Sequence, residues 1–167
     1  PLFGSLVLGE DVIARAETLG KQFASAFTAP GARGRKRLID QGMLRGELGD
    51  RRLLLGVVGV DHLRKVLTKL FDEDEFLSPH GLRALSRYHR DHPYVLEVDG
   101  IHATIDYEPA ESTTSMFGGN SNWRGPIWFP LNYLLISALH RYGRFFGDEL
   151  TLEYPTGSGQ HRDLAAI

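Results

Sequence analysis

The sequence predicts a mainly α fold with short β-hairpin insertions, and three observations lead to this prediction. Apolar residues recur at helical spacing in three stretches, 10–28, 62–73 and 130–146. Residues 94–107 instead alternate around Gly100, which is typical of a small hairpin. The chain has 167 residues, of which 42% are hydrophobic, so it is long enough for one soluble globular domain with a core.

The composition excludes several classes of function. A formal charge of -2 creates no overall field that would recruit nucleic acid or an anionic membrane. The absence of cysteine excludes disulfides, thiolate metal sites and a cysteine nucleophile, and it is compatible with the cytoplasm. No apolar run approaches the ~20 residues that span a bilayer. We therefore expect no cofactor, no nucleic-acid partner and no membrane partner, and we interpret both ends of the chain as cuts.

The first third of the chain holds one predicted helix between ambiguous segments. Residues 1–8 are apolar and suit either a helix end or a strand. Residues 29–52 are rich in glycine and charge, and we interpret the basic cluster at 33–37 as a solvated loop rather than a phosphate site, because acidic residues follow it closely. Residues 53–60 suit a buried strand or a helix end. The helix at 10–28 is predicted from one apolar face, made of Val12, Ala16, Leu19, Phe23 and Phe27.

The middle of the chain begins with a second helix. Asp61 is a suitable N-cap, and an apolar stripe predicts a helix over 62–73. The acidic tract 72–75 that follows is typical of a solvated turn and lacks the pattern of a calcium loop. Residues 81–89 are expected to form one or two helical turns. Three nearby histidines, His80, His89 and His92, suggest zinc, but their spacing matches no helical zinc motif, so we predict no metal site.

The last third is dominated by a helix from Pro130 to Phe146. Its first half is apolar almost all round, so we expect it to be enclosed. Gly147 is a plausible residue to end it. The tail contains a strand-like TLEY and a PTGSG turn at 155–159, which lacks the spacing and the lysine of a phosphate-binding loop.

A polar, aromatic and glycine-rich stretch at 107–128 leads directly into this helix and has the composition of a binding site. Indole rings stack on pyranose faces, and asparagine, glutamate and arginine form directional hydrogen bonds with hydroxyl groups, so a sugar is the ligand class that fits best. Trp123 and Trp128 enclose Arg124-Gly-Pro, a rigid backbone that is unusual for core aromatics. At least one of these indoles is therefore predicted to face a ligand, with packing in the core as the alternative.

Glycoside hydrolysis needs two carboxyl groups, and three acidic residues lie beside the aromatic stretch. Asp106 and Glu108 suit surface charges equally well. Glu111 lies between Ala110 and a Ser/Thr run, where a surface charge has less reason to occur, so it is the candidate catalytic or sugar-contacting carboxylate.

The sequence resembles the C-terminal part of the catalytic domain in bacterial members of glycoside hydrolase family 63, which includes mannosyl-oligosaccharide glucosidase and hydrolases of mannosylglycerate or glucosylglycerate. The resemblance covers roughly 53–159 and is carried by LSPHGLRALSRYHRDHPY, by PAESTTSMFGGNSNWRGPIWFPLNYLL with Asn132 and Tyr133, and by PTGSG. It implies an (α/α)6 toroid and hydrolysis with inversion at the anomeric carbon.

A complete toroid of about twelve helices needs well over 200 residues, so residues 1–167 are expected to be a single partial domain, a fragment of that larger catalytic domain. In the family the general acid, an aspartate, lies before the matched region, and the general base, a glutamate, lies after the PTGSG turn. Neither has a clear counterpart in this chain. The resemblance therefore transfers only the sugar-contact loop: Asn120, Asn122, Trp123, Arg124 and Trp128, with Glu111 and Phe117 as neighbours.

Three functional hypotheses remain open on the sequence. The first is a segment of an inverting α-glycosidase that contributes the sugar-binding loop, in the bacterial cytoplasm, completed by the rest of its polypeptide or by self-association. The second is a carbohydrate-binding fragment that has lost the catalytic pair. The third is a structural helical module whose aromatics belong to the core.

Overall fold

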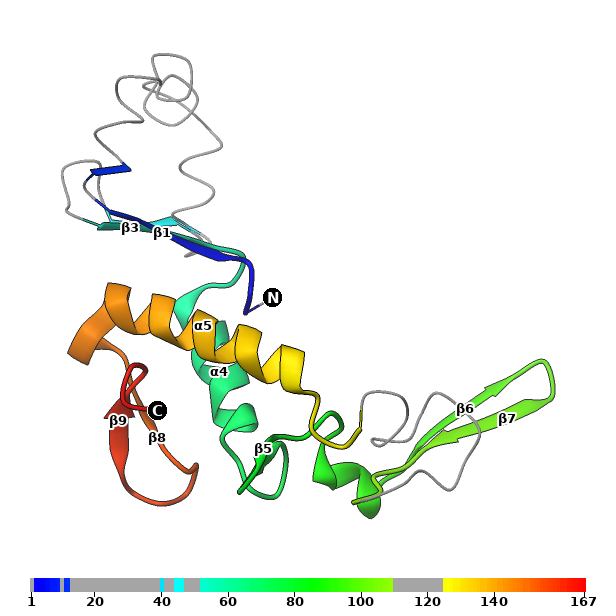
Figure 1. Ribbon diagram of the computed structural model, residues 1–167. Helices are drawn as coiled ribbons and strands as arrows, with labels where there is room; N and C mark the ends of the chain where they lie inside the picture. Colours follow the sequence, from blue (N-terminus) through cyan, green and yellow to red (C-terminus); the bar gives the residue numbers. More distant parts are fainter. Residues whose placement is uncertain (1, 10, 13–39, 41–43, 47–51, 110–124) are drawn as a thin grey trace. The chain divides into compact units, whose positions relative to one another are not determined.

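The computed structural model describes residues 2–9, 11–12, 40, 44–46, 52–109 and 125–167 (Figure 1). These residues divide into two compact units. Unit 1 comprises the described residues of 1–65, 135–151 and 163–167, and unit 2 comprises those of 66–134 and 152–162. Within the described ranges, no helix is both long and apolar enough to cross a bilayer.

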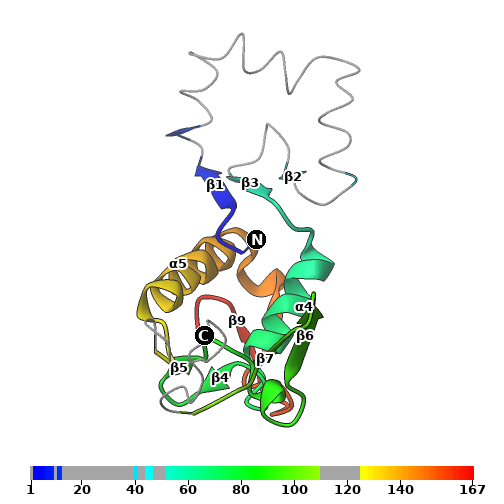
Figure 2. The same cartoon turned by 90° about the vertical axis from the view of Figure 1, so that its right-hand side faces the viewer.

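Unit 1 contains a small antiparallel sheet in the order β1-β3-β2, and Figure 2 labels the three strands. Strand β3 lies in the centre and pairs with β1 from Ser5 opposite Gly56 to Gly9 opposite Arg52. The strands are β1 (Ser5–Gly9), β2 (Leu44–Arg45) and β3 (Arg52–Gly56). The apolar segments 1–8 and 53–60 suited either a helix end or a strand. Residues 5–8 of the first lie in β1, residues 53–56 of the second lie in β3, and Val60 begins the next helix.

The core of unit 1 is formed by the second half of helix α5 (Phe129–Phe146) and its neighbours. The Tyr142 side chain is 1% exposed, and its hydroxyl donates to the Leu2 carbonyl oxygen over 3.4 Å. Gly143 approaches the backbone of Ala165 so closely that a Cβ atom would lie 2.9 Å from the Ala165 nitrogen. The other buried apolar side chains here are Leu2, Leu54, Leu63, Leu135, Ala138, Leu139, Phe146, Leu150 and Leu164.

Unit 2 joins the end of helix α4 (Val60–Leu70) to a series of short hairpins and turns. Phe71, directly after this helix, is buried, and its ring meets the Tyr154 ring edge-on at 5.2 Å. The Phe71 carbonyl also accepts a hydrogen bond from the Thr156 amide. The remaining strands are β4 (Leu77–Ser78), β5 (Gly81–Leu82), β6 (Tyr94–Val98), β7 (Ile101–Ile105), β8 (Thr151–Glu153) and β9 (His161–Asp163). Two 3₁₀ helices are also present, η1 (Arg87–Arg90) and η2 (Gly147–Glu149). Of these elements, η2, Thr151 of β8 and Asp163 of β9 belong to unit 1.

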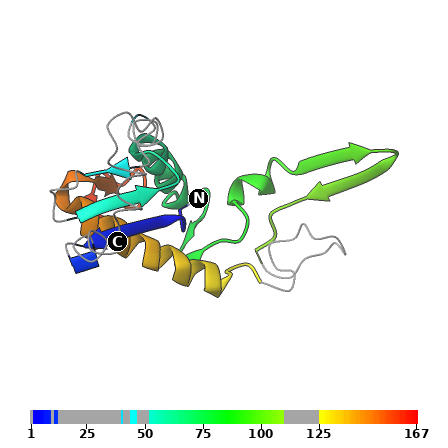
Figure 3. The same cartoon turned by 90° about the horizontal axis from the view of Figure 1, so that it is seen from above.

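Several predicted elements are confirmed. Helices α4 and α5 occupy the predicted stretches; α5 ends at Phe146 as predicted, and the other three ends are shifted by one to three residues. Strands β6 and β7 form the predicted hairpin (Figure 3), and Gly147 has a positive φ of 50° directly after α5, as a helix-ending glycine should. Residues 81–89 form β5 and the start of η1 rather than α-helical turns. The predicted helix at 10–28 lies outside the described residues except for 11–12.

The prediction of a mainly α fold that is part of an (α/α)6 toroid is wrong for this structure. The described residues contain two α-helices and nine short strands in small antiparallel sheets, so they form a mixed α and β structure. The physical reason lies in the pairing of the short strands: β4 and β5 have two residues each and exist only because they pair with each other. Sequence periodicity cannot reveal strands of this length.

Candidate functional site

Most of the predicted sugar-contact residues lie outside the described part of the chain. Glu111, Phe117, Asn120, Asn122, Trp123 and Arg124 all fall in the range 110–124. Trp128 is described: it is half-buried and immediately precedes helix α5. Asp106 is also described, and its Oδ1 atom is buried with no hydrogen-bond partner among the described residues. The described part of the candidate site thus consists of the segments on either side of the range 110–124.

The segment that follows the predicted loop is held in place by residues 81–84. Ile127 forms an antiparallel β-bridge with Arg83, and the Ala84 amide donates to the Pro126 carbonyl over 2.7 Å. Gly125 has a φ of 70°, a conformation that L side chains rarely adopt. The two parts of the sequence that carry the family resemblance, 77–94 and 109–135, are thus joined by a backbone hydrogen bond and a β-bridge.

Asn132, in the first turns of α5, completes this connection. Its Oδ1 accepts a hydrogen bond from the Leu82 amide at 2.7 Å, and its Nδ2 donates to the Leu82 carbonyl at 3.2 Å. The same Nδ2 also donates to the Trp128 carbonyl at 3.1 Å. We refer to residues 81–84, 125–128 and Asn132 as the Asn132 clamp.

Glycine is the residue type that fits position 81 of the clamp without strain. Its φ is 119°, and a Cβ atom would lie 2.9 Å from the Asn132 Oδ1. The Gly81 carbonyl accepts a hydrogen bond from the Ser78 hydroxyl at 2.6 Å, which fixes the turn between β4 and β5. The requirement for glycine therefore has two causes, the backbone conformation and the close approach of an amide side chain.

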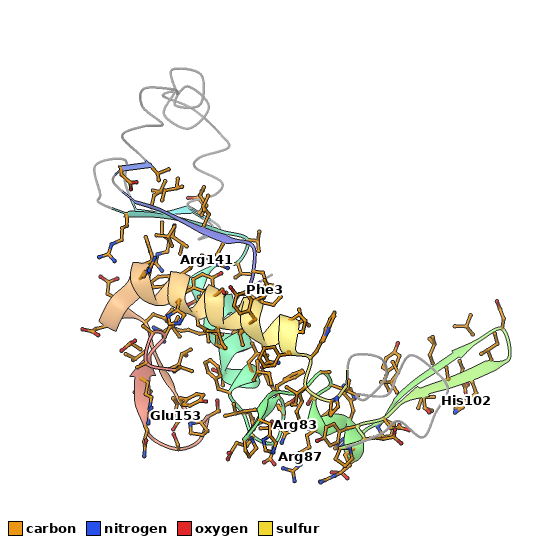
Figure 4. The ribbon with its side chains drawn as sticks, in the orientation of Figure 1. Phe3, Arg83, Arg87, His102, Arg141 and Glu153 are labelled. Atoms are coloured by element: carbon orange, nitrogen blue, oxygen red, sulfur yellow. The ribbon has the colours of Figure 1, made fainter. Side chains whose placement is uncertain are left out.

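The Arg83 guanidinium ties the clamp to the turn after helix α4 (Figure 4). Its Nη1 donates to the carbonyl oxygens of Glu73, at 3.0 Å, and Glu75, at 3.3 Å, and also to that of Leu77. Because this arginine is used to bind carbonyl groups of its own chain, its role in the structure is to hold the turn together.

Beside this turn, Glu75 and Ser86 form a partly buried polar pair. The Ser86 side chain caps η1 by accepting the Tyr88 amide at 3.1 Å, and its hydroxyl donates to the Glu75 carboxylate, which also binds Lys69. Burial alone would raise the pKa of Glu75, but the hydrogen bonds from Lys69 and Ser86 outweigh burial and hold that pKa below its ordinary value. Glu75 is thus an ionised structural group, although the sequence placed it in a solvated turn.

Two of the three histidines near this turn, His89 and His92, make local side-chain contacts. The His92 ring stacks on the Tyr88 ring at 4.2 Å, with an angle of 5° between the planes. The His89 Nδ1 lies 3.0 Å from the His92 carbonyl oxygen, and His80 lies in the exposed turn between β4 and β5. In the part of the chain that the structure describes, no three histidine or acidic side chains are grouped so that they could hold a metal ion.

Two glycine amides of the PTGSG turn donate hydrogen bonds to a nearby carboxylate. The Glu153 carboxylate accepts hydrogen bonds from the Gly157 amide, at 2.9 Å, and from the Gly159 amide. These two backbone hydrogen bonds lower the pKa of Glu153. The amide groups that a phosphate would need are therefore already bound to a carboxylate of the same turn.

The role of the clamp residues is not predicted from the sequence. Asn132 enters there only through the family resemblance, although a lone amide in an apolar helix is itself a signal that the side chain has a specific partner. Gly81 gave a weaker signal, since a glycine after a Ser-Pro turn has many ordinary explanations.

Comparisons with known proteins give a consistent result. Residues 52–153 match the family model described as "Glycosyl hydrolase family 63 C-terminal domain". An uncharacterized protein of Saccharomyces cerevisiae is 48% identical over 116 residues, which are 70% of this chain and 11% of that protein. A protein of Schizosaccharomyces pombe described as "Probable mannosyl-oligosaccharide glucosidase" is 30% identical over 92 residues, which are 53% of this chain and 8% of that protein.

The matched part of the chain thus spans about a tenth of the length of these relatives. Both relatives come from yeasts, so they do not support the bacterial origin that we expected. No solved structure matches the chain.

Proposed function

This chain belongs to glycosyl hydrolase family 63, and we propose on that premise that it supplies the sugar-binding loop of an α-glycosidase. The proposed loop contains Asn120, Asn122, Trp123, Arg124 and Trp128, with Phe117 and Glu111 beside it. In this proposal the amide and guanidinium groups bind sugar hydroxyls, one indole stacks on a pyranose face, and Glu111 binds sugar or orients Arg124.

The Asn132 clamp is the observation that carries this proposal. A binding loop needs a rigid support, because side chains on loosely held backbone lose binding energy through their own ordering. The clamp provides such support at Gly125–Trp128, directly after the proposed contact residues, through one β-bridge and three side-chain hydrogen bonds of Asn132.

The proposed substrates are α-glucosides or glycosyl-glycerate compounds. The name of the Schizosaccharomyces pombe relative supports a glucosidase, and the resemblance to bacterial members of the family adds the glycerate derivatives. We propose inversion at the anomeric carbon as the outcome, and we propose that this chain alone does not supply both catalytic carboxyl groups. The rest of a longer polypeptide, or a second copy, would complete the site.

Binding and turnover must be measured separately to test this function. In the full-length polypeptide, Trp123→Ala and Arg124→Ala should each weaken binding of short α-glucosides at least tenfold in calorimetry and leave the melting temperature within about 2 °C. Glu97→Gln, on the exposed hairpin strand β6, is the matched control and should change neither.

Two outcomes would contradict the proposal. Turnover of glucosylglycerate or an α-glucoside by residues 1–167 alone would show that the catalytic pair lies within this chain. Unchanged sugar binding together with a lowered melting temperature would favour a structural module, an alternative that gains support from the half-buried position of Trp128.

A further inference from the structure

The β6–β7 hairpin has one face made entirely of apolar side chains. In its antiparallel register, Tyr94 lies opposite Ile105, Leu96 opposite Ala103, and Val98 opposite Ile101. Residues that face each other across an antiparallel pair, and every second residue along a strand, point to the same side. All six of these side chains therefore share one side of the ribbon, which we call the apolar hairpin face.

The opposite side of the hairpin is more polar. It carries Val95 opposite Thr104 and Glu97 opposite His102, which Figure 4 labels. The Glu97 Oε1 lies 3.1 Å from the His102 Nδ1. Such a difference between the two sides is typical of a strand pair that buries one face and exposes the other to water.

The apolar hairpin face is nevertheless open in this structure. Tyr94 is 53% exposed, Leu96 46% and Ile101 67%. Single exposed apolar residues are ordinary, but a contiguous set on one face marks a contact surface. A two-stranded hairpin is also marginally stable unless something packs on it. Both arguments predict that a further surface covers this face.

The dimensions of the face restrict what can cover it. Five residues per strand at about 3.4 Å, with two strands about 4.8 Å apart, give an area on the order of 170 Å². A stable complex between separate proteins buries about 800 Å² on each partner. The face by itself is smaller than such an interface, whereas a surface within the same polypeptide can cover it without the entropic cost of association.

Charge argues against a lipid surface. Among the described residues of the hairpin, the charged side chains are the acidic Glu97 and Asp99 with the titratable His102, and there is no lysine or arginine. Segments that lie on membranes usually carry basic residues beside their apolar face, because the headgroups are anionic.

We propose that the apolar hairpin face docks on an apolar surface supplied by another part of the same polypeptide, outside residues 1–167. The hairpin lies wholly inside the region 52–153 that matches the family model, and in the two yeast relatives the matched region is only 11% and 8% of the length. These two relatives therefore carry ample additional sequence for such a contact. The proposal holds whether or not residues 120–128 bind sugar.

Photo-crosslinking in the full-length polypeptide tests this docking. Tyr94 and Val95 are neighbours of similar exposure, 53% and 50%, on opposite faces of the hairpin. A photoreactive phenylalanine derivative placed at Tyr94 should crosslink within the same molecule to residues outside this chain. The crosslinking yield should be at least tenfold higher than from the same group at Val95, and it should not change on hundredfold dilution.

Each other outcome overturns the proposal. Equal yields at Tyr94 and Val95 would show that the face is not selectively covered. Crosslinks that disappear on dilution, or that join differently isotope-labelled copies, would identify a second copy as the occupant. Crosslinks that return into residues 1–167, or a gene whose reading frame contains only these residues, would exclude an additional segment.

Discussion

The Asn132 clamp and the β6–β7 hairpin both belong to unit 2, but they differ in how far their polar groups are paired and their apolar side chains are buried. In the clamp, the Leu82 amide and carbonyl both find partners in one side chain of the same chain. In the hairpin, the backbone is paired over five residues on each strand, yet the apolar face is left exposed. The polar groups of the clamp find their partners within this chain. The hairpin pairs its backbone groups, but its apolar side chains stay exposed.

This difference teaches that hydrogen bonding and apolar burial can be satisfied at different levels of a structure. Backbone groups must be paired locally, because leaving them unpaired is costly. Apolar area is not directional and can be covered by any suitable surface that the chain meets later. Substitutions of clamp residues should therefore lower the free energy of unfolding, whereas substitutions on the apolar hairpin face should change it little.

Removal of the clamp amide should have the largest effect. Asn132→Ala deletes three hydrogen bonds and leaves the half-buried Leu82 amide and carbonyl without their partner, so unfolding free energy should fall by about 3 kcal/mol. Urea denaturation measures this change. Tyr133→Ala, at an exposed neighbouring position of α5, is the control, and an equal loss in both variants would show that the clamp contributes nothing specific.

Alanine substitutions at two glycines with positive φ should distinguish the cost of backbone strain from the cost of a close contact. Gly81→Ala should cost roughly 2 kcal/mol, because it adds strain at a φ of 119° and places Cβ 2.9 Å from the Asn132 Oδ1. Gly100→Ala in the hairpin turn, at a φ of 80° with no atom within 4 Å of the added Cβ, should cost about 1 kcal/mol from strain alone. If thermal unfolding gives equal losses, the close approach in the clamp is not a constraint.

The pH dependence of stability should show the contribution of the ionised Glu75 carboxylate to the free energy of unfolding. Its pKa is lowered in the folded state, so its contribution is present above the ordinary glutamate pKa and is lost as the pH falls through the lowered value. The effect should stay below about 1 kcal/mol, because Lys69 is largely exposed and water screens the pair. Urea denaturation between pH 3 and pH 7 should show a shallower acid loss for Glu75→Gln than for the unmodified protein.

Glu73→Gln provides the control for this pH series, because Glu73 is exposed. It should preserve the full acid loss. A profile for Glu75→Gln that matches the unmodified protein would mean that the Glu75 carboxylate is not preferentially stabilised in its ionised form.

The smallest expected effect belongs to the hairpin. Ile101→Ser on residues 1–167 should change unfolding free energy by less than about 0.5 kcal/mol, since Ile101 is 67% exposed. The same change should lower the fluorescence of a dye that binds apolar surface, whereas Thr104→Ser on the opposite face should not. A large loss of stability would indicate that the face is already covered within this chain.

The sequence predicted the elements whose signal is local. The apolar stripes predicted α4 and α5, and alternation around Gly100 predicted the β6–β7 hairpin. Strands β1 and β3 remained ambiguous, because an apolar run with glycine has no period that separates strand from helix end. The sugar-contact loop was located by composition and resemblance, and its role stays a prediction.

The sequence by itself determined the family, the two described helices and the alternation of the hairpin, since each depends on residues close together in the chain or on a contiguous motif. Only the tertiary structure decided that Asn132 binds Leu82, fifty positions away, and that two-residue strands form between the helices. These features depend on contacts between distant segments, whose formation is governed by packing and hydrogen-bond geometry in three dimensions and leaves no periodic trace in the sequence.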